Sequence, residues 1–151
     1  MEENRPITPK TPSNWKWFKM EEFLKSETAE RLGFWNVPLQ EHVENMDKLV
    51  TNLLDRLRED WGSPIRITSG YRVPGLNEAV GGVKNSQHIE GKAADIQPIG
   101  RSFDDFTAFL VEWLKGKNFD QCIIEKKGTS RWIHISYDEK RNRRKIFSLN
   151  K

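Results

Sequence analysis

The sequence predicts a single α+β domain in which helices pack on a mostly antiparallel sheet. One long stretch carries apolar residues at helical spacing, and a shorter stretch repeats this pattern with several aromatic residues. Short apolar or alternating runs bounded by Gly and Pro indicate strands, and three of them follow one another at the end of the chain. A length of 151 residues fits one domain.

The first helical region begins near Phe18, and Ser26 is placed to cap a second short helix that Gly33 ends. The main core helix is expected over residues 39–61, and Gly62 closes it. Its apolar stripe consists of Val43, Met46, Leu49, Val50, Leu53, Leu54, Leu57 and Trp61. Ser102 and Asp105 form a capping-box-like start for a later helix. That helix carries Phe103, Phe106, Phe109, Leu110, Trp113 and Leu114.

The strand candidates are short and lie between these helices and after them. Residues 65–68 alternate apolar and polar side chains, and residues 93–97 form a second candidate that ends at Pro98. The last three candidates span residues 119–125, 131–137 and 145–149. The stretch from Pro74 to Gly91 is too broken by Gly and polar residues for a long element.

Composition indicates a globular protein without a membrane span. Hydrophobic residues make up 36% of the chain and charged residues 31%, and no apolar stretch is long enough to cross a bilayer. The single cysteine, Cys122, excludes an internal disulfide and is expected to be a buried structural thiol. Much of the net charge of +3 comes from residues 140–145, where a solvated turn is expected and contact with an anionic polymer is the alternative.

The start of the chain has a different character from the rest. Residues 1–17 carry mixed charge and three prolines, so we expect a flexible or loosely docked arm before a single domain over residues 18–151. No apolar signal-peptide core stands near the N-terminus, and synthesis in the cytoplasm without a signal peptide is the expectation.

Two of the three histidines stand in settings suited to metal ligation. His88 lies in a loop, and Asp95 follows seven residues later, which lets the loop fold back so that imidazole and carboxylate converge on one ion. His134 lies on a strand candidate and shares a face with Trp132. Two imidazoles and one carboxylate are the ligands of a catalytic zinc site with one open position. The alternative is that both histidines are structural residues held by hydrogen bonds.

A dense and ordered set of motifs runs through the middle of the chain. The motifs are Ser69-Gly70-Tyr71-Arg72, Asn77, Val80-Gly81-Gly82, Ser86-Gln87-His88, Gly91 and Ala93-Ala94-Asp95-Ile96. This set closely resembles the M15 family of zinc D-Ala-D-Ala carboxypeptidases and related peptidoglycan peptidases. Trp132-Ile133-His134 resembles that family's second histidine motif. The segment from Phe23 to Pro38 is similar to the N-terminal part of the family's phage and bacterial branch, so the resemblance covers residues 18–137.

The resemblance implies a zinc ion held by His88, Asp95 and His134, in a fold like that of the D,D-peptidases and the hedgehog signalling domain. It also implies that Arg72 stabilises negative charge in the transition state, for which a guanidinium offers a rigid and permanently charged fork. Further candidates for substrate binding are Ser86, Gln87, Tyr71 and Trp132. Their alternatives are local backbone hydrogen bonds for the polar pair and simple packing for the aromatic pair. The glycines Gly70, Gly81, Gly82 and Gly91 are expected to adopt positive φ.

One position departs from the family pattern. Many members place an acidic residue three positions before the last histidine, where this chain has Arg131. Glu125 is the best substitute as catalytic base, because a hairpin through residues 126–129 would bring it beside His134. The related hedgehog domain has a similar arrangement. The alternative for Glu125 is a surface carboxylate paired with Lys126 or Lys127.

These observations predict a zinc peptidase that hydrolyses amide bonds of peptidoglycan stem peptides, as a D,D-carboxypeptidase or an endolysin-type endopeptidase. A zinc-containing cell-wall binding module with weak or no turnover is the alternative, since Arg131 stands at the usual acidic position. A monomer without a nucleic-acid partner is expected, which acts on the cell wall after its release.

Overall fold

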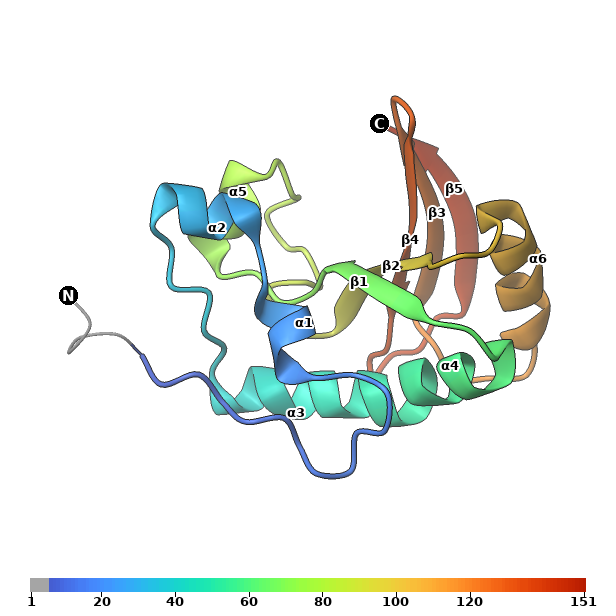
Figure 1. Ribbon diagram of the computed structural model, residues 1–151, viewed down its shortest axis with the longest axis horizontal. Coiled ribbons are helices and arrows are strands. Elements are labelled where there is room, and N and C mark those ends of the chain that lie inside the picture. The colour runs from blue at the N-terminus through green and yellow to red at the C-terminus, as the bar shows by residue number, and fades with distance from the viewer. Residues whose placement is uncertain (1–5) are drawn as a thin grey trace.

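The computed structural model describes residues 6–151 and contains short helices around one five-stranded sheet (Figure 1). The helical elements are α1 (Met20–Leu24), α2 (Glu27–Leu32), α3 (Gln40–Leu49), the π-helical turn η2 (Val50–Leu54), α4 (Asp55–Trp61), α5 (Pro74–Ala79) and α6 (Phe103–Trp113). The strands are β1 (Ile65–Ser69), β2 (Ala93–Pro98), β3 (Gln121–Lys127), β4 (Ser130–Ser136) and β5 (Lys145–Asn150). This is the predicted α+β class.

The sheet has the strand order β1-β2-β4-β3-β5. The pairs β1–β2, β2–β4 and β3–β4 are antiparallel, whereas β3–β5 is parallel. The predicted description of a mostly antiparallel sheet is therefore confirmed. Strand β2 lies in the sheet interior between β1 and β4, which places the residues after the His88 loop next to the His134 strand.

The main core helix is confirmed, with a local change in its hydrogen-bonding pattern. α3, η2 and α4 follow one another without interruption from residue 40 to residue 61 and lie along one side of the sheet (Figure 1). The helix ends at Gly62, whose φ of 76° is the left-handed conformation that glycine adopts at helix ends. Its predicted stripe is buried, with Leu49, Leu54 and Leu57 at 0% exposure.

Alternation along the strands divides the sheet into an apolar face and a polar face. Ala94, Ile96, Ile133 and Ile135 belong to the core cluster together with residues of the main helix and α6. Since successive side chains of a strand point to opposite faces, Asp95 and His134 lie on the other face. The helices thus stabilise one face and leave the second available for chemistry.

The predicted helix caps are present. Ser26 Oγ accepts a hydrogen bond from Ala29 N at 3.1 Å, and Gly33 ends α2 with φ 78°. Ser102 Oγ accepts from Asp105 N at 3.2 Å at the start of α6. His42 caps the beginning of α3, because its Nδ1 accepts from Leu39 N at 3.1 Å. His42 is the third histidine of the chain, beside His88 and His134.

Residues 1–5 of the predicted arm lie outside the described part of the chain. Farther along the arm, Trp15 is buried in the core cluster and its Nε1 donates to Asp47 Oδ1 at 2.8 Å. Lys16 N and Trp17 N both donate to the carboxylate of Asp55. The flexible arm over residues 1–17 stays a prediction, and these contacts tie the end of that segment to the main helix.

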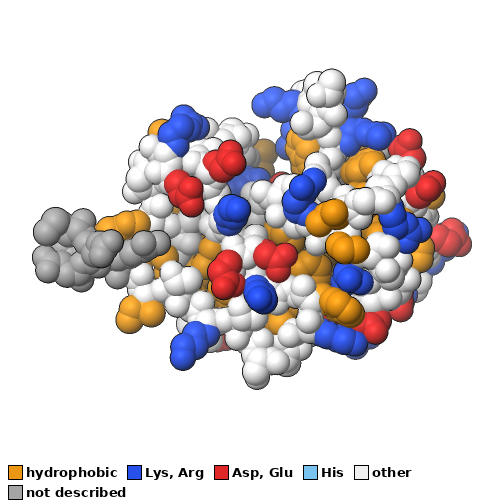
Figure 2. Space-filling view, viewed as in Figure 1, with side chains coloured by type: hydrophobic (Ala, Val, Ile, Leu, Met, Phe, Trp, Pro, Cys, Tyr) orange, Lys and Arg blue, Asp and Glu red, His pale blue; other side chains and the backbone are white. Residues whose placement is uncertain are grey.

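The surface visible in Figure 2 carries Lys and Arg side chains at many points, with Asp and Glu among them. Cys122 is buried, and burial raises the pKa of its thiol to about 12, which agrees with a structural role. Among the described residues, no helix is both long enough and apolar enough to cross a membrane.

Candidate metal centre

The pairing of β2 with β4 places Asp95 directly opposite His134 in the register. Both side chains leave the sheet on its polar face, so the two groups are brought together by strand geometry alone. Neither residue needs a long side chain to reach the other. This cross-strand pair is the floor of the candidate site.

The loop between α5 and β2 brings His88 to this pair. Gly91 lies in this loop with φ 76°, and a Cβ at this position would lie 2.5 Å from His42 O. Arg72 N donates to His88 O at 3.1 Å, which fixes the backbone of the loop. The loop therefore packs so closely on α3 that only glycine fits at residue 91.

The expectation of positive φ is confirmed for Gly81 and Gly91 and is wrong for Gly70 and Gly82. The latter two are required by close contact instead. A Cβ on Gly70 would lie 2.6 Å from Phe23 O, and one on Gly82 would lie 2.1 Å from Asn77 Oδ1. Sequence motifs identify such glycines but do not distinguish a special φ from a crowded backbone.

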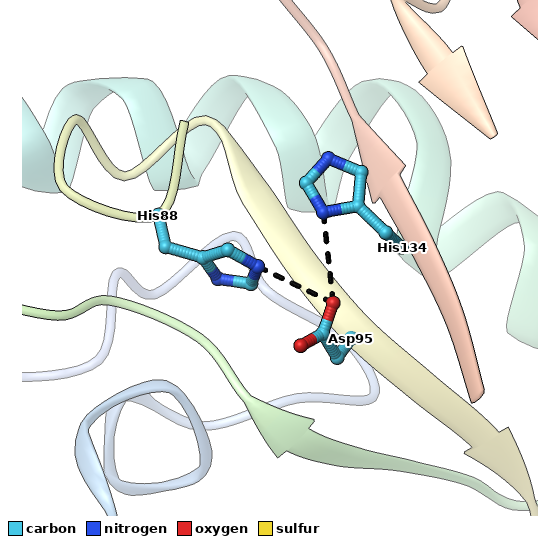
Figure 3. A group of neighbouring side chains, drawn as sticks. All are labelled: His88, Asp95 and His134. Carbon is cyan, nitrogen blue, oxygen red and sulfur yellow. Dashed lines mark ion pairs between the residues drawn. The ribbon is translucent and has the colours of Figure 1, made fainter. Parts of the chain in front are cut away.

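His88, Asp95 and His134 form one compact, buried group (Figure 3). One ligand atom from each residue lies within 4.8 Å of the others. Asp95 Oδ1 is 3.3 Å from His88 Nε2 and 3.6 Å from His134 Nδ1. The three residues predicted as metal ligands are therefore brought together.

The outer nitrogen of each imidazole is engaged away from the centre of the group. His88 Nδ1 lies 2.7 Å from the carbonyl oxygen of Gly70, to which it can only donate. His134 Nε2 lies 3.2 Å from Gln87 Oε1. The inward nitrogens, Nε2 of His88 and Nδ1 of His134, are thereby free to present lone pairs.

Asp95 supplies a buried oxygen without a hydrogen-bond partner. Oδ1 faces both imidazoles, yet among the described residues no group donates to it with hydrogen-bond geometry. A buried carboxylate oxygen in this state costs free energy unless a cation satisfies it. Burial raises the pKa of Asp95, but the positive charge that His88 and His134 carry when they are protonated outweighs burial and holds this pKa well below its usual range. The donor set and the unpaired oxygen together fit a divalent metal ion.

The second oxygen of Asp95 is held by Arg72. Arg72 Nη2 lies 3.3 Å from Asp95 Oδ2, Nε donates to Ser69 Oγ at 3.0 Å and Nη1 donates to Asn77 Oδ1 at 3.0 Å. Burial lowers the pKa of Arg72, while Asp95 and Glu125 raise it. The guanidinium stays charged and fixes the orientation of the Asp95 carboxylate.

Glu125 lies on the same face of the sheet as His134. In the β3–β4 register Ile123 stands opposite His134, and Glu125 stands opposite Trp132 two residues farther along. Its carboxylate accepts a hydrogen bond from Trp132 Nε1 at 3.0 Å and forms an ion pair with Lys151 Nζ at 2.6 Å. Glu125 is 4% exposed. The alternative, in which Glu125 is a surface carboxylate paired with Lys126 or Lys127, is therefore wrong.

Arg131, which stands at the family's usual acidic position, lies on the opposite face of β4. Its Nη1 pairs with Asp104 Oδ1 of α6 at 2.8 Å, and its guanidinium lies 4.7 Å from the Phe103 ring centroid. In a regular strand, a residue three positions before His134 points away from it. Arg131 is therefore directed away from the histidines.

A cavity of about 620 Å³ opens onto this group. Its lining includes the three predicted ligands together with Arg72, Glu125, Ser86 and Gln87. Arg141, Arg143 and Lys151 contribute positive charge to the same lining. The cavity thus combines the buried cluster, one candidate base and several cations.

The remaining predicted residues differ in their surroundings. Ser86 Oγ accepts from His88 N at 3.1 Å, so it supports the loop. Tyr71 is 3% exposed, stacks on His42 with ring centroids 5.0 Å apart and belongs to the core cluster. Trp132 reaches the site through its bond to Glu125. The substrate-binding roles of these residues stay predictions.

Two residues that line or support the site were not expected to do so. Lys151 contacts Glu125, and Arg143 binds the buried carboxylate of Asp120 through Nε and Nη2, each at 2.8 Å. Arg143 belongs to the basic run that was expected to be a solvated turn. The sequence of this run gives no sign that Arg143 turns toward a buried carboxylate, because its partner Asp120 lies 23 residues away in the sequence.

The geometry of this group agrees with what comparison with known proteins finds. A scan against protein-family models matches residues 16–136 to the family described as Peptidase M15. The chain belongs to the M15 peptidase family. A search of curated proteins finds no match. The match ends at the last residue of β4, so it includes all three residues of the candidate metal cluster and Glu125, but not Arg143 or Lys151.

Proposed function

We propose that this M15 peptidase is zinc-dependent and hydrolyses amide bonds in peptidoglycan stem peptides. The observation that carries the proposal is the buried, unpaired Oδ1 of Asp95 facing His88 Nε2 and His134 Nδ1. Two imidazoles and one carboxylate suit zinc with one coordination position left open, which is the arrangement of catalytic rather than structural zinc sites.

When bound, zinc would supply Lewis-acid polarisation of the scissile carbonyl and of the attacking water. Glu125 lines the same cavity and is the proposed proton carrier, which takes a proton from the water and delivers it to the leaving amine. Trp132 Nε1 and Lys151 Nζ hold its carboxylate in place. Arg72 contributes fixed positive charge beside the carbonyl oxygen, where negative charge develops.

The charge of the cavity supports this class of substrate. Peptidoglycan stem peptides carry free carboxylates. The lining holds the cations Arg72, Arg141, Arg143 and Lys151 beside the carboxylates Glu90, Asp95, Glu125 and Asp138. Of these cations, Arg141 has no side-chain ion pair among the described residues and is the one proposed to meet a substrate carboxylate. Cations in a recessed site attract and orient anionic peptides. Ser86 and Gln87, which also line the cavity, are proposed to contribute polar contacts on the loop side.

We further propose that the protein acts as a monomer on the cell wall after its release from the cytoplasm.

The test combines elemental analysis of the purified protein with incubation on muropeptides and mass spectrometry of the products. About one equivalent of zinc and cleavage products are expected, and His88→Ala should lose both while its circular dichroism is unchanged. Loss of one terminal residue would identify a carboxypeptidase, and internal fragments an endopeptidase. His42→Gln is the matched control, because Gln at this helix position retains a capping side chain. Full cleavage by His88→Ala would refute the proposal.

The second candidate is a binding module that holds zinc but does not turn over substrate. One observation favours it: Arg131 stands where many family members have an acidic residue. Glu125 argues against it, because it offers a carboxylate on the same face of the sheet as His134. Retention on insoluble cell walls, without released fragments at any zinc concentration, would favour this candidate over the peptidase.

A further inference from the structure

Three side chains outside the candidate metal cluster, Gln87, Asp120 and Arg143, form a hydrogen-bonded chain that is centred on the buried Asp120 and ends on His134. Asp120 lies immediately before β3 and is fully buried. Its Oδ1 accepts from Arg143 N at 3.0 Å and from Arg143 Nε at 2.8 Å, and its Oδ2 accepts from Arg143 Nη2 at 2.8 Å and from Gln87 Nε2 at 2.7 Å. With four donors, this carboxylate is fully satisfied and rigidly held.

The fixed charge of Asp120 decides the orientation of the Gln87 amide. An ionised carboxylate only accepts hydrogen bonds, so Gln87 must turn its NH₂ group toward Asp120. The amide oxygen then faces His134, where Oε1 lies 3.2 Å from Nε2. Rotating the amide would oppose two oxygens at Asp120 and is therefore excluded by electrostatics.

The orientation of Gln87 in turn decides the tautomer of His134. An amide oxygen accepts only, so Nε2 of His134 must carry the proton and donate it. The lone pair is left on Nδ1, the nitrogen that faces Asp95 Oδ1 at 3.6 Å. His88 is protonated on Nδ1 and keeps its lone pair on Nε2, because Nδ1 donates to a backbone carbonyl. The tautomer of His134 depends instead on side chains that mutation can change.

We infer that Gln87, Asp120 and Arg143 are positioning residues that fix His134 as an Nδ1 metal ligand, an inference that rests on the proposed metal site. Outer hydrogen-bond partners of metal-binding histidines set ring orientation and ligand basicity. Arg143 lies beyond residue 136, where the family match ends. The basic side chains of residues 140–145 are exposed, as expected for a solvated turn, and this turn also contributes Arg143 to the support of the site.

Zn²⁺ affinity of the metal-free full chain tests the inference without substrate. Gln87→Met keeps the length of the side chain but removes both hydrogen bonds, and it should weaken Zn²⁺ binding about 10–100-fold in competition with a chromophoric chelator. Arg143→Lys keeps the positive charge but loses the two parallel guanidinium donors to Asp120. Its Zn²⁺ affinity should lie between those of wild type and Gln87→Met. Arg144→Gln is the matched control, since its guanidinium contacts Asn118 instead, and it should bind as wild type.

A second measurement reads the tautomer directly. In ¹⁵N-labelled, metal-free wild type at about pH 8.5, above the ordinary titration range of imidazole, His134 should be protonated on Nε2 alone. Gln87→Met should show a mixture of the two tautomers. A wild-type His134 protonated on Nδ1, or Zn²⁺ binding by folded Gln87→Met within twofold of wild type, would overturn the inference. Failure of wild type to bind Zn²⁺ would instead refute the proposed function. The tautomer measurement would still show whether Gln87 fixes the proton of His134 on Nε2.

Discussion

Asp120, immediately before β3, and Glu125, within β3, are two buried carboxylates that differ in how they are held. Asp120 is 0% exposed and accepts four hydrogen bonds, two of them from the Arg143 guanidinium. Glu125 is 4% exposed and lines the cavity. It accepts one hydrogen bond from Trp132 and forms an ion pair with Lys151, whose side chain is 52% exposed.

The difference separates a group that holds geometry from one suited to move a proton. A carboxylate with four donors loses several hydrogen bonds when it is protonated, so Asp120 is a poor base and a good anchor. Glu125 has acceptor capacity left and faces the cavity, which a proton carrier requires. Position along the strand agrees with these proposed roles, because Glu125 shares a face with His134 while Asp120 lies before the strand begins.

The largest effect is expected from Glu125→Gln. The amide keeps size and shape but cannot carry the proton, so kcat on muropeptides should fall about 10²–10⁴-fold. Zn²⁺ affinity should stay within about threefold of wild type, because Glu125 is not among the proposed ligands. Steady-state kinetics and chelator competition on the same preparation measure the two quantities.

Glu112→Gln, a change at an exposed residue of α6 that pairs with Lys115, is the matched control and should leave kcat unaltered. If Glu125→Gln retained wild-type kcat, the division of roles between the two carboxylates would be wrong and another base would have to be sought.

Asp120 is expected to act on stability at low pH. Burial alone raises the pKa of Asp120, but hydrogen bonds from Arg143 and Gln87 outweigh it and lower this pKa from 3.8 to about 2. A depressed folded-state pKa contributes stability that is present above the unfolded value and is lost as pH falls through the folded one. The free energy of unfolding of wild type should therefore lose about 2 kcal/mol from this group between about pH 5 and pH 2.

Urea unfolding of metal-free wild type and Asp120→Asn at several pH values measures this contribution. Asp120→Asn should be less stable at neutral pH, and the gap should narrow by about 2 kcal/mol as the pH falls to about 2. Asp104→Asn, at a side chain that is 79% exposed, serves as control and should show no such narrowing. A gap that is constant with pH would mean that Asp120 is not held as an ion.

The helices and strands could be predicted from the sequence because they follow short-range rules, and the cluster could be predicted because its residues lie in motifs that resemble those of a known family. The stripe over residues 39–61 has helical spacing, and caps such as Ser26 and Gly33 are local in the sequence. The meeting of His88, Asp95 and His134 was expected from their residue types and from the family resemblance, and strand pairing brings Asp95 and His134 into register. Local patterns and a known motif were sufficient for these features.

The support around the cluster could not be predicted in the same way. The link from Arg143 to Asp120 depends on the parallel pairing of β5 with β3, which no periodicity reveals. Tyr71 belongs to a motif beside Arg72, yet its ring packs into the core while the guanidinium turns to the cavity. Such outcomes depend on tertiary packing, which composition and spacing do not encode.

A smaller effect is expected when Glu125 is kept and a residue that donates a hydrogen bond to it is changed. Trp132→Phe removes the indole donor to Glu125 Oε2 and keeps most of the aromatic surface. A hydrogen bond to a charged group contributes about 1.5 kcal/mol, so kcat/KM should fall about tenfold while Zn²⁺ affinity is unchanged. Trp113→Phe removes an equivalent bond, 2.7 Å from Nε1 to Asp60 Oδ2, on the far side of the molecule and should leave kcat/KM unaltered. Equal losses in both variants would show a general effect on folding instead of a specific one on Glu125.

The smallest effect is expected at Arg131, where the chain departs from the family pattern. Its guanidinium is directed to Asp104 and Phe103 on the opposite face from His134, and its side chain is 44% exposed. Arg131→Ala should therefore keep kcat/KM within about twofold of wild type and lower the free energy of unfolding by at most about 1 kcal/mol, the contribution of an exposed ion pair. A tenfold loss of kcat/KM with normal stability would place Arg131 in the reaction and would reverse the assignment of the base to β3. A null result would mean that the position three before His134 is free to vary here because the required carboxylate comes from the neighbouring strand.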